Sequence, residues 1–492
     1  MKEKTDRVTR ICVTAILLGV MLIICGVTVG IGQARQNDAS LNASSDTSSD
    51  SDASAAASSE NESIDESTPD DESSTEDEAA LAVARFMELT ELLDDYTKRI
   101  MTEEFVQYIV SSHGTADLNA VSDALENGTY TRETWHDVTG YTITVQYDVF
   151  CKKLDSSSEN YDPYISFIGD SKQEGLIRFG FGGDFSFADN YYVGKAFVKR
   201  GEELDSIIDP EIVEMMKAFD IMTLNNEFVL SDNGTALSGK RFVFKASPVR
   251  VWIYDALGVD LVTLGNNHVY DYGEEAFFDT MQTLADAGIK YIGAGQNLEE
   301  AQQAWYFIIN GRKIGILNGY RANEGSVTYT PGATKDRAGV LYSFDEIEMS
   351  KLIEQTKAQC DVLILFMHWG REDVTTLESI IKKQARVYID AGVDAIVGCH
   401  THVAQGLEIY NGVPIVYSMG NFLFNFKTLN SCLVGIEIDQ DGALTMTYTP
   451  LLQKGTKLNS PTQIQAQMIR DLIMAISINV NISGSDIVSE IK

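Results

Sequence analysis

The histidines of this chain stand at the ends of apolar segments that are typical of buried β-strands. The chain has 492 residues and six histidines, and four of the six come directly after such segments. These four are His268, His368, His400 and His402. In α/β sheets, residues just past the carboxyl ends of the strands meet at one edge, where ligands bind. The pattern therefore predicts an α/β domain with a histidine-rich site at a sheet edge.

Predicted strands and helices alternate through the middle and the end of the chain. The strand-like segments are residues 176–181, 219–224, 259–264, 361–366 and 395–397, and helix-like segments cover about 274–287 and 374–391. The pairs Asn310-Gly311 and Asn411-Gly412 predict two β-hairpin turns. This alternation is the signature of an α/β domain, which we place at residues 171–455.

Carboxylate and amide side chains follow the same predicted strands. Asp184, Glu227 and Asn267 each come a few residues after a strand end. Imidazole, carboxylate and amide ligands together suit Mn, Fe, Zn or Mg better than metals that prefer soft ligands. Two such ions, about 3.5–4 Å apart, would need a bridging carboxylate and ligands from several strand ends. We therefore predict a site for one or two divalent metal ions, with the ligands Asp184, Glu227, Asn267, His368, His400 and His402.

Each of these residues also has an ordinary structural interpretation. A single histidine such as His368 is more often packed in a core than bound to a metal. Asp184 follows two glycines and suits a turn or a helix cap, and Glu227 could pair with an arginine. His400 and His402 carry more weight, because an extended His-x-His segment places both rings on one side of the chain. A metal site explains all of these positions together, whereas the ordinary interpretation needs a separate coincidence for each.

Charge limits the partners of this chain. It carries 38 Lys and Arg against 72 Asp and Glu, a net charge of −34. Nucleic-acid binding requires a basic surface that neutralises phosphates, so we exclude a nucleic-acid partner. An anionic substrate or polymer would need local basic groups or metal ions to overcome the repulsion.

The N-terminal residues predict a membrane anchor. Residues 11–32 carry no charge and are rich in Ile, Leu, Val and Met, which suits a membrane-spanning helix. Basic residues precede this segment and acids follow it, so the positive-inside rule places residues 1–10 in the cytoplasm. We therefore expect a single-pass cell-membrane protein whose main domain is extracytoplasmic. The alternatives are a cleaved signal peptide, whose apolar part usually has about 7–15 residues, and a lipid-modified Cys25.

Composition sets three further regions apart. Residues 33–80 contain 14 acids, one arginine and almost no large apolar side chain, so we expect a disordered Ser/Asp/Glu-rich linker. For residues 81–170 we expect an accessory region with amphipathic helices and a strand at 141–150. For residues 456–492 we expect a C-terminal helical extension.

Six short motifs occur in a fixed order between about residues 175 and 427. They are Gly183-Asp184, Asn225-Asn226-Glu227, NNHVYDYG at 266–273, His368-Trp369-Gly370, His400-Thr401-His402 and YSMGNF at 417–422. Together they resemble the capsule-synthesis CapA family, which is related to the calcineurin-like metallophosphoesterases. Membrane-anchored members of that family are implicated in making or exporting poly-γ-glutamate. The resemblance implies a four-layer α/β/β/α sandwich with metal ligands on loops at the strand ends.

The resemblance also implies a role for each site residue. Asp184 matches the first Asp of the metallophosphoesterase pattern, and Glu227 replaces its bridging Asp. The residues that match further ligand positions are Asn267, His368, His400 and His402. His268 matches the histidine that protonates the leaving group, and Asp271 would orient it. Ser186 stands where the pattern has a histidine ligand, which weakens one metal position.

Two functions follow from this resemblance. The first is a metal-dependent phosphoester hydrolase associated with poly-γ-glutamate capsule or other envelope polymer synthesis or export, with His268 and Asp271 as its catalytic residues. In such an enzyme, water activated by metal would attack phosphorus. The alternative is a non-catalytic component of a capsule polymer synthesis or export complex that retains the metal-site architecture. The retained histidines favour the first function, whereas the predicted anchor and the family association favour the second.

Overall fold

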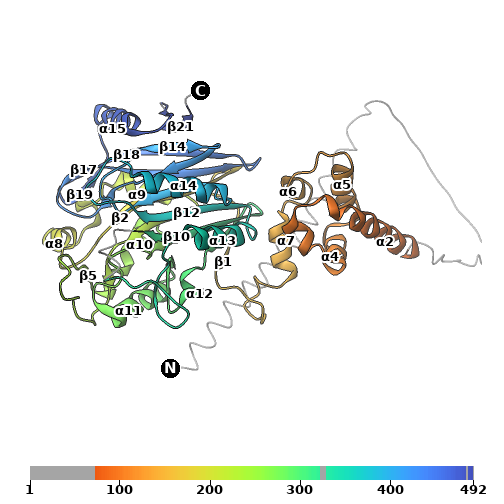
Figure 1. The fold of residues 1–492 in the computed structure, drawn as a ribbon, viewed down its shortest axis with the longest axis horizontal. Helices are drawn as coiled ribbons and strands as arrows, with labels where there is room; N and C mark the ends of the chain where they lie inside the picture. The colour runs from red at the N-terminus through yellow and green to blue at the C-terminus, as the bar shows by residue number, and fades with distance from the viewer. Residues whose placement is uncertain (1–71, 322–328, 484–485, 491–492) are drawn as a thin grey trace, which may run out of the picture. The chain divides into compact units, whose positions relative to one another are not determined.

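The apolar segments predicted as strands form two mixed β-sheets within an α/β domain (Figure 1). The computed structural model describes residues 72–321, 329–483 and 486–490. All of them belong to one unit, Pro69–Lys492.

The first sheet has seven strands in the order β1-β9-β10-β12-β13-β15-β14. They are β1 (Ile165–Gly169), β9 (Trp305–Ile309), β10 (Arg312–Arg321), β12 (Val362–Trp369), β13 (Ala395–Cys399), β15 (Val413–Val416) and β14 (Leu407–Tyr410). Strands β10, β12, β13 and β15 run parallel, and β9 and β14 pair antiparallel with the two outer members of this group. The hairpin turns predicted at 310–311 and 411–412 are confirmed, since all four turn residues have positive φ.

The second sheet has ten strands. Its main path is β20-β21-β18-β17-β2-β3-β6-β7, while β16 pairs with β2 and β19 with β18. The bounds are β2 (Leu176–Phe185), β3 (Ile221–Asn226), β6 (Leu261–Thr263), β7 (Lys290–Ile292), β16 (Asn421–Leu423), β17 (Thr428–Asp439), β18 (Leu444–Lys454), β19 (Lys457–Asn459), β20 (Val480–Ile482) and β21 (Ile487–Glu490). Strands β2, β3, β6 and β7 run parallel, and the C-terminal strands extend the sheet antiparallel.

The two sheets pack face to face over a shared apolar core. Phe179 of β2 contacts Phe307 of β9, and Phe181 of β2 contacts Phe366 of β12. Strands β3 and β12 are buried along their whole length. Burial on both faces explains why these strands are nearly continuous apolar runs rather than alternating patterns.

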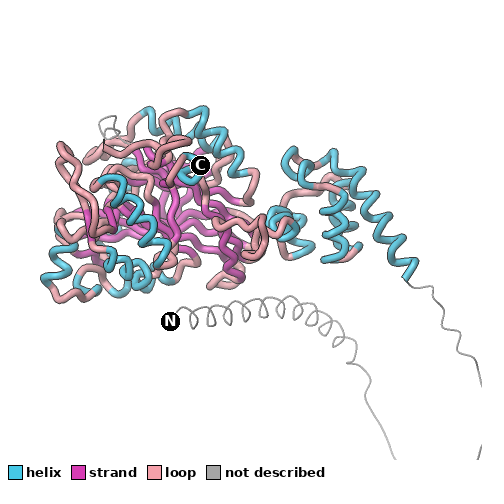
Figure 2. The backbone as a smooth tube through the Cα atoms, turned by 90° about the horizontal axis from the view of Figure 1, so that it is seen from below, coloured by secondary structure: helices cyan, strands magenta, loops and turns pink. Residues whose placement is uncertain are grey.

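Helices pack on the outer face of each sheet, as Figure 2 shows. Against the second sheet lie α8 (Tyr192–Lys199), α9 (Pro210–Lys217), α10 (Trp252–Leu257) and α11 (Gly273–Asp286). Against the first sheet lie α13 (Glu346–Lys357) and α14 (Ser379–Asp390). The minor elements are α12 (Leu298–Ala301), the strand pairs β4 (Val229–Leu230) with β5 (Lys245–Ala246) and β8 (Ala294–Gly295) with β11 (Gly339–Val340), and 3₁₀ turns at Thr90–Leu92, Leu204–Ser206 and Pro248–Val251.

Residues 72–150 form a series of helices joined by short loops and have their own apolar core. The helices are α2 (Glu72–Leu89), α3 (Asp95–Ile100), α4 (Glu103–His113), α5 (Thr115–Glu126), α6 (Glu133–Thr139) and α7 (Ile143–Phe150). The strand predicted at 141–150 is therefore wrong, because this segment forms α7. A short apolar run does not distinguish a strand from a buried helix, and packing around Ile143 and Val145 decides in favour of the helix.

The predicted fold class, a four-layer metallophosphoesterase-like sandwich preceded by a transmembrane helix and a disordered linker, is wrong as stated, because no described helix is long and apolar enough to cross a membrane. Residues 33–71 of the expected linker lie outside the described residues. The structure is an α/β domain with two mixed sheets. Residues 72–80 of the expected linker belong to helix α2. Residues 456–492, expected to be a helical extension, contain α15 (Gln463–Ile476) and three strands that join the second sheet.

The predicted membrane location is also corrected. Within 72–321, 329–483 and 486–490, no helix combines the length and the apolar character needed to cross a membrane. The longest of these helices, α2, has 18 residues but carries Glu76, Asp77 and Glu78. Helices α11 and α15 have 14 residues each, or about 21 Å, which is short of a hydrocarbon core of about 30 Å. The segment expected to span the membrane, 11–32, lies outside the described residues.

Buried polar contacts hold the helical region against the first sheet. Lys313 of β10 forms an ion pair with Asp148 of α7, and both side chains are buried. Asp361, just before β12, accepts hydrogen bonds from the hydroxyls of Thr142 (2.6 Å) and Thr144 (2.9 Å). Because these contacts join segments far apart in sequence, the α/β domain and helix α7 are expected to unfold together.

Removing one member of the buried ion pair tests this docking. We expect Asp148→Leu to lower the free energy of unfolding by about 3–5 kcal/mol, since the ammonium of Lys313 would stay buried without its partner. The double variant Asp148→Leu/Lys313→Met should recover most of that loss in urea denaturation, and exposed Asp155→Leu serves as the control. A double variant as unstable as Asp148→Leu would contradict the assignment.

Candidate metal centre

The carboxyl ends of five strands, from both sheets, meet at one site. Strand β2 provides Asp184 and β12 provides His368, while Glu227 follows β3, Asn267 and His268 follow β6, and His400 and His402 follow β13. The structure thus brings together all of the residues predicted as ligands. Parallel order within β2-β3-β6 and within β12-β13 places these ends at a common edge.

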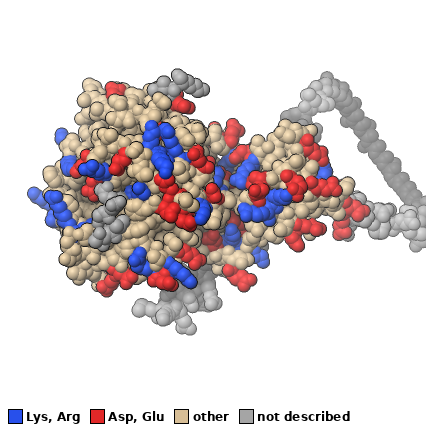
Figure 3. All heavy atoms as spheres, viewed as in Figure 1, with Lys and Arg blue, Asp and Glu red and all other residues tan. Residues whose placement is uncertain are grey.

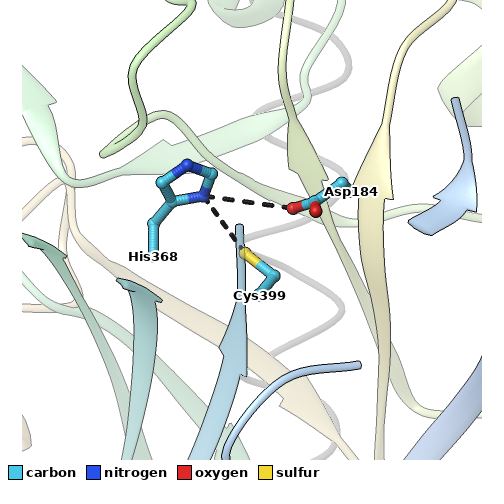
Figure 4. A group of neighbouring side chains, drawn as sticks. All are labelled: Asp184, His368 and Cys399. Atoms are coloured by element: carbon cyan, nitrogen blue, oxygen red, sulfur yellow. Dashed lines mark hydrogen bonds and ion pairs between the residues drawn. The ribbon is translucent and has the colours of Figure 1, made fainter. Parts of the chain in front are cut away.

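Asp184 lies in the middle of this cluster. Its Oδ2 is 3.1 Å from Nδ1 of His402, and its Oδ1 is 4.0 Å from Nδ1 of His368. Figure 4 shows the ring of His368 facing both Asp184 and Cys399. The Oε1 atom of Glu227 is 3.9 Å from Nε2 of His368. Three groups have ligand atoms within 4.8 Å of one another: Asp184, His368 and Cys399; Glu227, His368 and His400; and Asp184, Glu227 and His402.

Several buried polar atoms at this site have no hydrogen-bond partner among the described residues. Among them are Oε1 of Glu227 and both ring nitrogens of His400. Leaving a buried donor or acceptor unpaired costs about 1–3 kcal/mol, and proteins rarely accept that cost without a reason. A divalent cation would satisfy the carboxylate oxygen and one imidazole nitrogen, so the residues present fit a metal ion.

The backbone that carries the two histidines after β13 is strained. His400 has φ 100° and His402 has φ 58°, so the extended geometry expected for this segment is wrong. Residues other than glycine rarely have a positive φ. Those that do cluster at functional sites, where the surrounding structure holds the backbone in this conformation. The amide N–H of His400 donates to both carboxylate oxygens of Asp184, at 3.1 and 3.2 Å, which holds this turn against β2.

Amide side chains organise the ligands. The Nδ2 group of Asn225, which sequence reasoning had not assigned to the site, donates to Oδ1 of Asp184 at 2.9 Å and lies 3.4 Å from Oε2 of Glu227. Its own Oδ1 accepts from Thr263, so the amide orientation is fixed. The predicted ligand Asn267 places Oδ1 2.8 Å from Nε2 of His368.

Cys399, the last residue of β13, also reaches the centre. Its Sγ lies 3.2 Å from Nδ1 of His368. Burial, reinforced by the charge of Asp184, raises the pKa of the Cys399 thiol well above its ordinary value. Without a bound metal the thiol is therefore protonated and acts as a weak donor.

The two carboxylates of the centre are shifted in opposite directions. Burial alone would raise the pKa of Asp184, but the hydrogen bond from His402 and the charges of the neighbouring histidines outweigh it and hold that pKa well below its ordinary value. Burial, reinforced by the charge of Asp184, raises the pKa of Glu227 well above its ordinary value. A bound cation would favour the ionised form of Glu227.

Burial keeps most of the histidines of the site neutral. It lowers the pKa of His400 to about 3 and that of His368 well below its ordinary value. Burial also disfavours charge on His402, but the hydrogen bond and the charge of Asp184 outweigh it and raise that pKa. Neutral imidazole is the form that binds metal, so the centre is prepared for ligation.

His268 and Asp271 form a pair beside the cluster, as their predicted roles require. Nδ1 of His268 is 2.8 Å from Oδ2 of Asp271, and Nε2 is 3.9 Å from Oε1 of Glu227. Asp271 is fully buried and also accepts from the backbone N–H of Phe244 at 2.7 Å. Burial lowers the pKa of His268 to about 4, against the opposing effect of Asp271.

Besides Asn225, sequence reasoning missed two further residues that support this site. The ammonium group of Lys240 contacts both the carboxylate of Asp271 and the backbone carbonyl of Asn267. Asn421, within the motif at 417–422, places Oδ1 2.9 Å from Nδ1 of His402. The motif could have pointed to Asn421, but nothing in the loop around Lys240 marks it in the sequence.

Gly183 holds two strands close together beneath the centre. The backbone N–H of Asp184 donates to the carbonyl of Gly420 at 2.9 Å. A Cβ atom at position 183 would collide with that carbonyl oxygen and crowd Met419. Glycine in the Gly183-Asp184 motif is therefore required by this close backbone approach.

The variant Gly183→Ala tests this packing. We expect the free energy of unfolding to fall by about 1–3 kcal/mol, because the collision with Gly420 forces the backbone apart. Differential scanning calorimetry measures the shift, and an unchanged melting temperature would show that Gly183 is not needed at this contact.

Comparison with known proteins identifies the family. The family model of bacterial capsule synthesis protein PGA_cap matches residues 178–426, a range that contains the whole centre. The capsule biosynthesis protein CapA of Bacillus anthracis is 30% identical over 206 residues, which cover 40% of this chain and 49% of that protein. The PGA biosynthesis protein CapA of Bacillus subtilis is 30% identical over 265 residues, covering 53% of this chain and 68% of that protein.

A more distant relative is a probable polyglutamine synthesis accessory protein of Mycobacterium tuberculosis. It is 25% identical over 278 residues, which cover 53% of this chain and 73% of that protein. The chain thus spans about half the length of the first of these relatives and more of the other two. The resemblance to the CapA family carried by the six motifs is confirmed. This chain belongs to the family of the bacterial capsule synthesis protein PGA_cap.

Proposed function

We propose that this chain is a divalent-metal-dependent hydrolase of phosphoesters that acts in the synthesis of poly-γ-glutamate capsule. The observation that carries the proposal is the set of buried atoms without hydrogen-bond partners in the described structure, Oε1 of Glu227 and both ring nitrogens of His400. Carboxylate, imidazole and amide donors together suit Mn, Fe, Zn or Mg. The residues that would hold one or two ions are Asp184, Glu227, Asn267, His368, His400 and His402.

Bound divalent ions at such centres stabilise anionic oxygens and lower the pKa of water. The residues of this chain would supply proton transfer and orientation. His268 points Nδ1 at Asp271 and Nε2 at the site. Because burial lowers the pKa of His268 to about 4, the ring is neutral without substrate, and the acid role requires the ring protonated on both nitrogens. The charge of Asp271 would favour that form, from which Nε2 would pass its proton to the oxygen of the leaving group. Asp271, held by Lys240 and the backbone of Phe244, would fix the orientation of that ring.

The proposed role in capsule synthesis rests on the names of two related proteins. The Bacillus subtilis relative is named a PGA biosynthesis protein and the Mycobacterium tuberculosis relative a polyglutamine synthesis accessory protein. On the face drawn in Figure 3, basic side chains are interspersed with acidic ones rather than gathered into one patch. Because the chain has a net charge of −34, it would repel an anionic precursor or polymer. Divalent metal ions bound at the centre would provide the attraction.

A second candidate function is a non-catalytic component of a capsule polymer synthesis or export complex. Ser186 favours this candidate, because a hydroxyl stands where related metallophosphoesterases are expected to carry a histidine ligand. The Ser186 side chain is buried, and its hydroxyl has no hydrogen-bond partner among the described residues. A hydroxyl binds a divalent ion less tightly than imidazole, so one of two ions would be held weakly.

Metal content tests the ligand set. We expect the full chain, purified after growth with Mn²⁺, to hold at least one equivalent of metal by inductively coupled plasma mass spectrometry. His400→Ala and His368→Ala should each lose most of it, because each removes an imidazole from a cluster of ligand atoms. His113→Ala, a histidine in the helical region, is the matched control. Retention of metal in both site variants would refute the ligand set.

Phosphoesterase assays test the role of His268. With Mn²⁺ and aryl phosphomonoesters and phosphodiesters as substrates, His268→Ala should lower kcat by about 10²–10⁴-fold while metal content stays unchanged. Asp271→Asn should show a smaller loss, since it disturbs only the orientation of the ring. Equal turnover in wild type and His268→Ala would remove His268 from the mechanism. A metal-loaded chain without turnover on any ester would favour the non-catalytic candidate.

A further inference from the structure

A continuous set of aromatic rings leads from the metal centre to the surface. We call it the aromatic wall, and it consists of Tyr191, Tyr192, Phe242, Phe244, Phe424 and Phe426. These rings come from three segments: α8 and the residue before it, the loop before β5, and the loop between β16 and β17. Backbone N–H of Asp189 donates to the carbonyl of Lys245 at 3.0 Å, which joins the first two segments.

The inner end of the wall touches two histidines of the site. The ring centroid of Phe244 lies 4.4 Å from that of His268. The ring centroid of Phe424 lies 4.6 Å from that of His402. Phe244 and Phe424 are 5.2 Å apart edge to face, and both are buried. A molecule whose phosphoryl group reaches the metal ligands would therefore have this wall directly beside it.

The outer end of the wall is exposed although it is large and apolar. Tyr192, Phe242 and Phe426 are 45%, 46% and 56% exposed. Tyr191 links them to the inner rings, because its ring centroid lies 4.5 Å from that of Phe244 and 4.8 Å from that of Tyr192. The ring centroids of Tyr192 and Phe426 are 4.4 Å apart. Single exposed apolar side chains are ordinary, but a connected group beside a polar centre marks a binding surface.

One cation completes the outer edge. The guanidinium of Arg241 lies over the ring of Phe242 at 4.9 Å, and Arg241 is exposed. A guanidinium on an aromatic face prefers a planar, electron-rich or anionic partner. An alkyl chain would gain nothing from that charge, so the wall suits a planar ring better than a lipid tail.

We propose that the aromatic wall is the subsite for a planar ring in the leaving group of the phosphoester substrate. This inference rests on the proposed function, because it places the phosphoryl group at the metal centre. Stacking against aromatic side chains tolerates many ring types, and the rings of the wall are held in place by one another before any ligand binds. The substrate class is accordingly a phosphoester of an aromatic or heteroaromatic alcohol, or of an alcohol that carries such a ring.

Phosphonates, which are not hydrolysed, test this inference by isothermal titration calorimetry on the full chain loaded with Mn²⁺. Benzylphosphonate should bind at least about tenfold more tightly than methylphosphonate, and more tightly than cyclohexylmethylphosphonate. Phe242→Ala and Phe426→Ala should each reduce the benzyl advantage about threefold or more and leave methylphosphonate affinity unchanged. Phe167→Ala, which removes an exposed ring on β1 outside the wall, is the control.

The other outcomes separate the two proposals. Equal binding of benzylphosphonate and methylphosphonate would overturn the subsite while leaving the phosphoester site intact. Equal binding of the benzyl and cyclohexylmethyl compounds would show a plain apolar surface and overturn the preference for a planar ring. If no phosphonate binds to the metal-loaded chain, the proposed function fails and the subsite fails with it.

Discussion

The buried carboxylate of Asp184 is the constraint on which the site depends. Asp184 lies on β2 of one sheet, whereas His368, His400 and His402 come from β12 and β13 of the other, so its contacts hold the carboxyl ends of the two sheets together. An isolated carboxylate in such a place would be neutralised or expelled, because burying an unpaired charge is costly. Here the amide of Asn225, the backbone of His400 and the ring of His402 compensate that cost. The strained backbone at His400 and His402 is maintained by the same contacts.

The buried atoms that these contacts leave without hydrogen-bond partners indicate the chemistry of the site. Glu227 is buried next to Asp184, and two carboxylates so close cannot both ionise without a cation between or beside them. The ring of His400 has neither nitrogen paired within the described structure. Structural ion-pair networks normally satisfy their members, whereas a centre prepared for a ligand leaves donor atoms free. The aromatic wall then gives this polar centre one apolar border, a combination that suits an organic molecule with one anionic end.

Sequence patterns indicated which residues gather at the candidate centre better than they indicated the structure around it. Histidines and acids after apolar segments pointed to Asp184, Glu227, Asn267, His368, His400 and His402, because strand ends are local features that period and composition reveal. Asn225 and Lys240 were missed, since their roles come from contacts across the fold.

The strand expected at 141–150 is a helix because packing against β10 decides its conformation. The membrane span expected at 11–32 lies outside the described residues, and none of the described helices is long and apolar enough to cross a membrane. The motif glycine Gly183 has a structural reason that only the backbone contact with Gly420 reveals.

We propose above all that the cluster around Asp184 binds a divalent cation. The most direct measurement is a crystal structure of the chain grown with Mn²⁺, with anomalous diffraction data collected at the manganese absorption edge. We predict anomalous density within coordination distance of Asp184, Glu227 and His400. Data that show no density there at saturating Mn²⁺, with the three side chains in place, would contradict it.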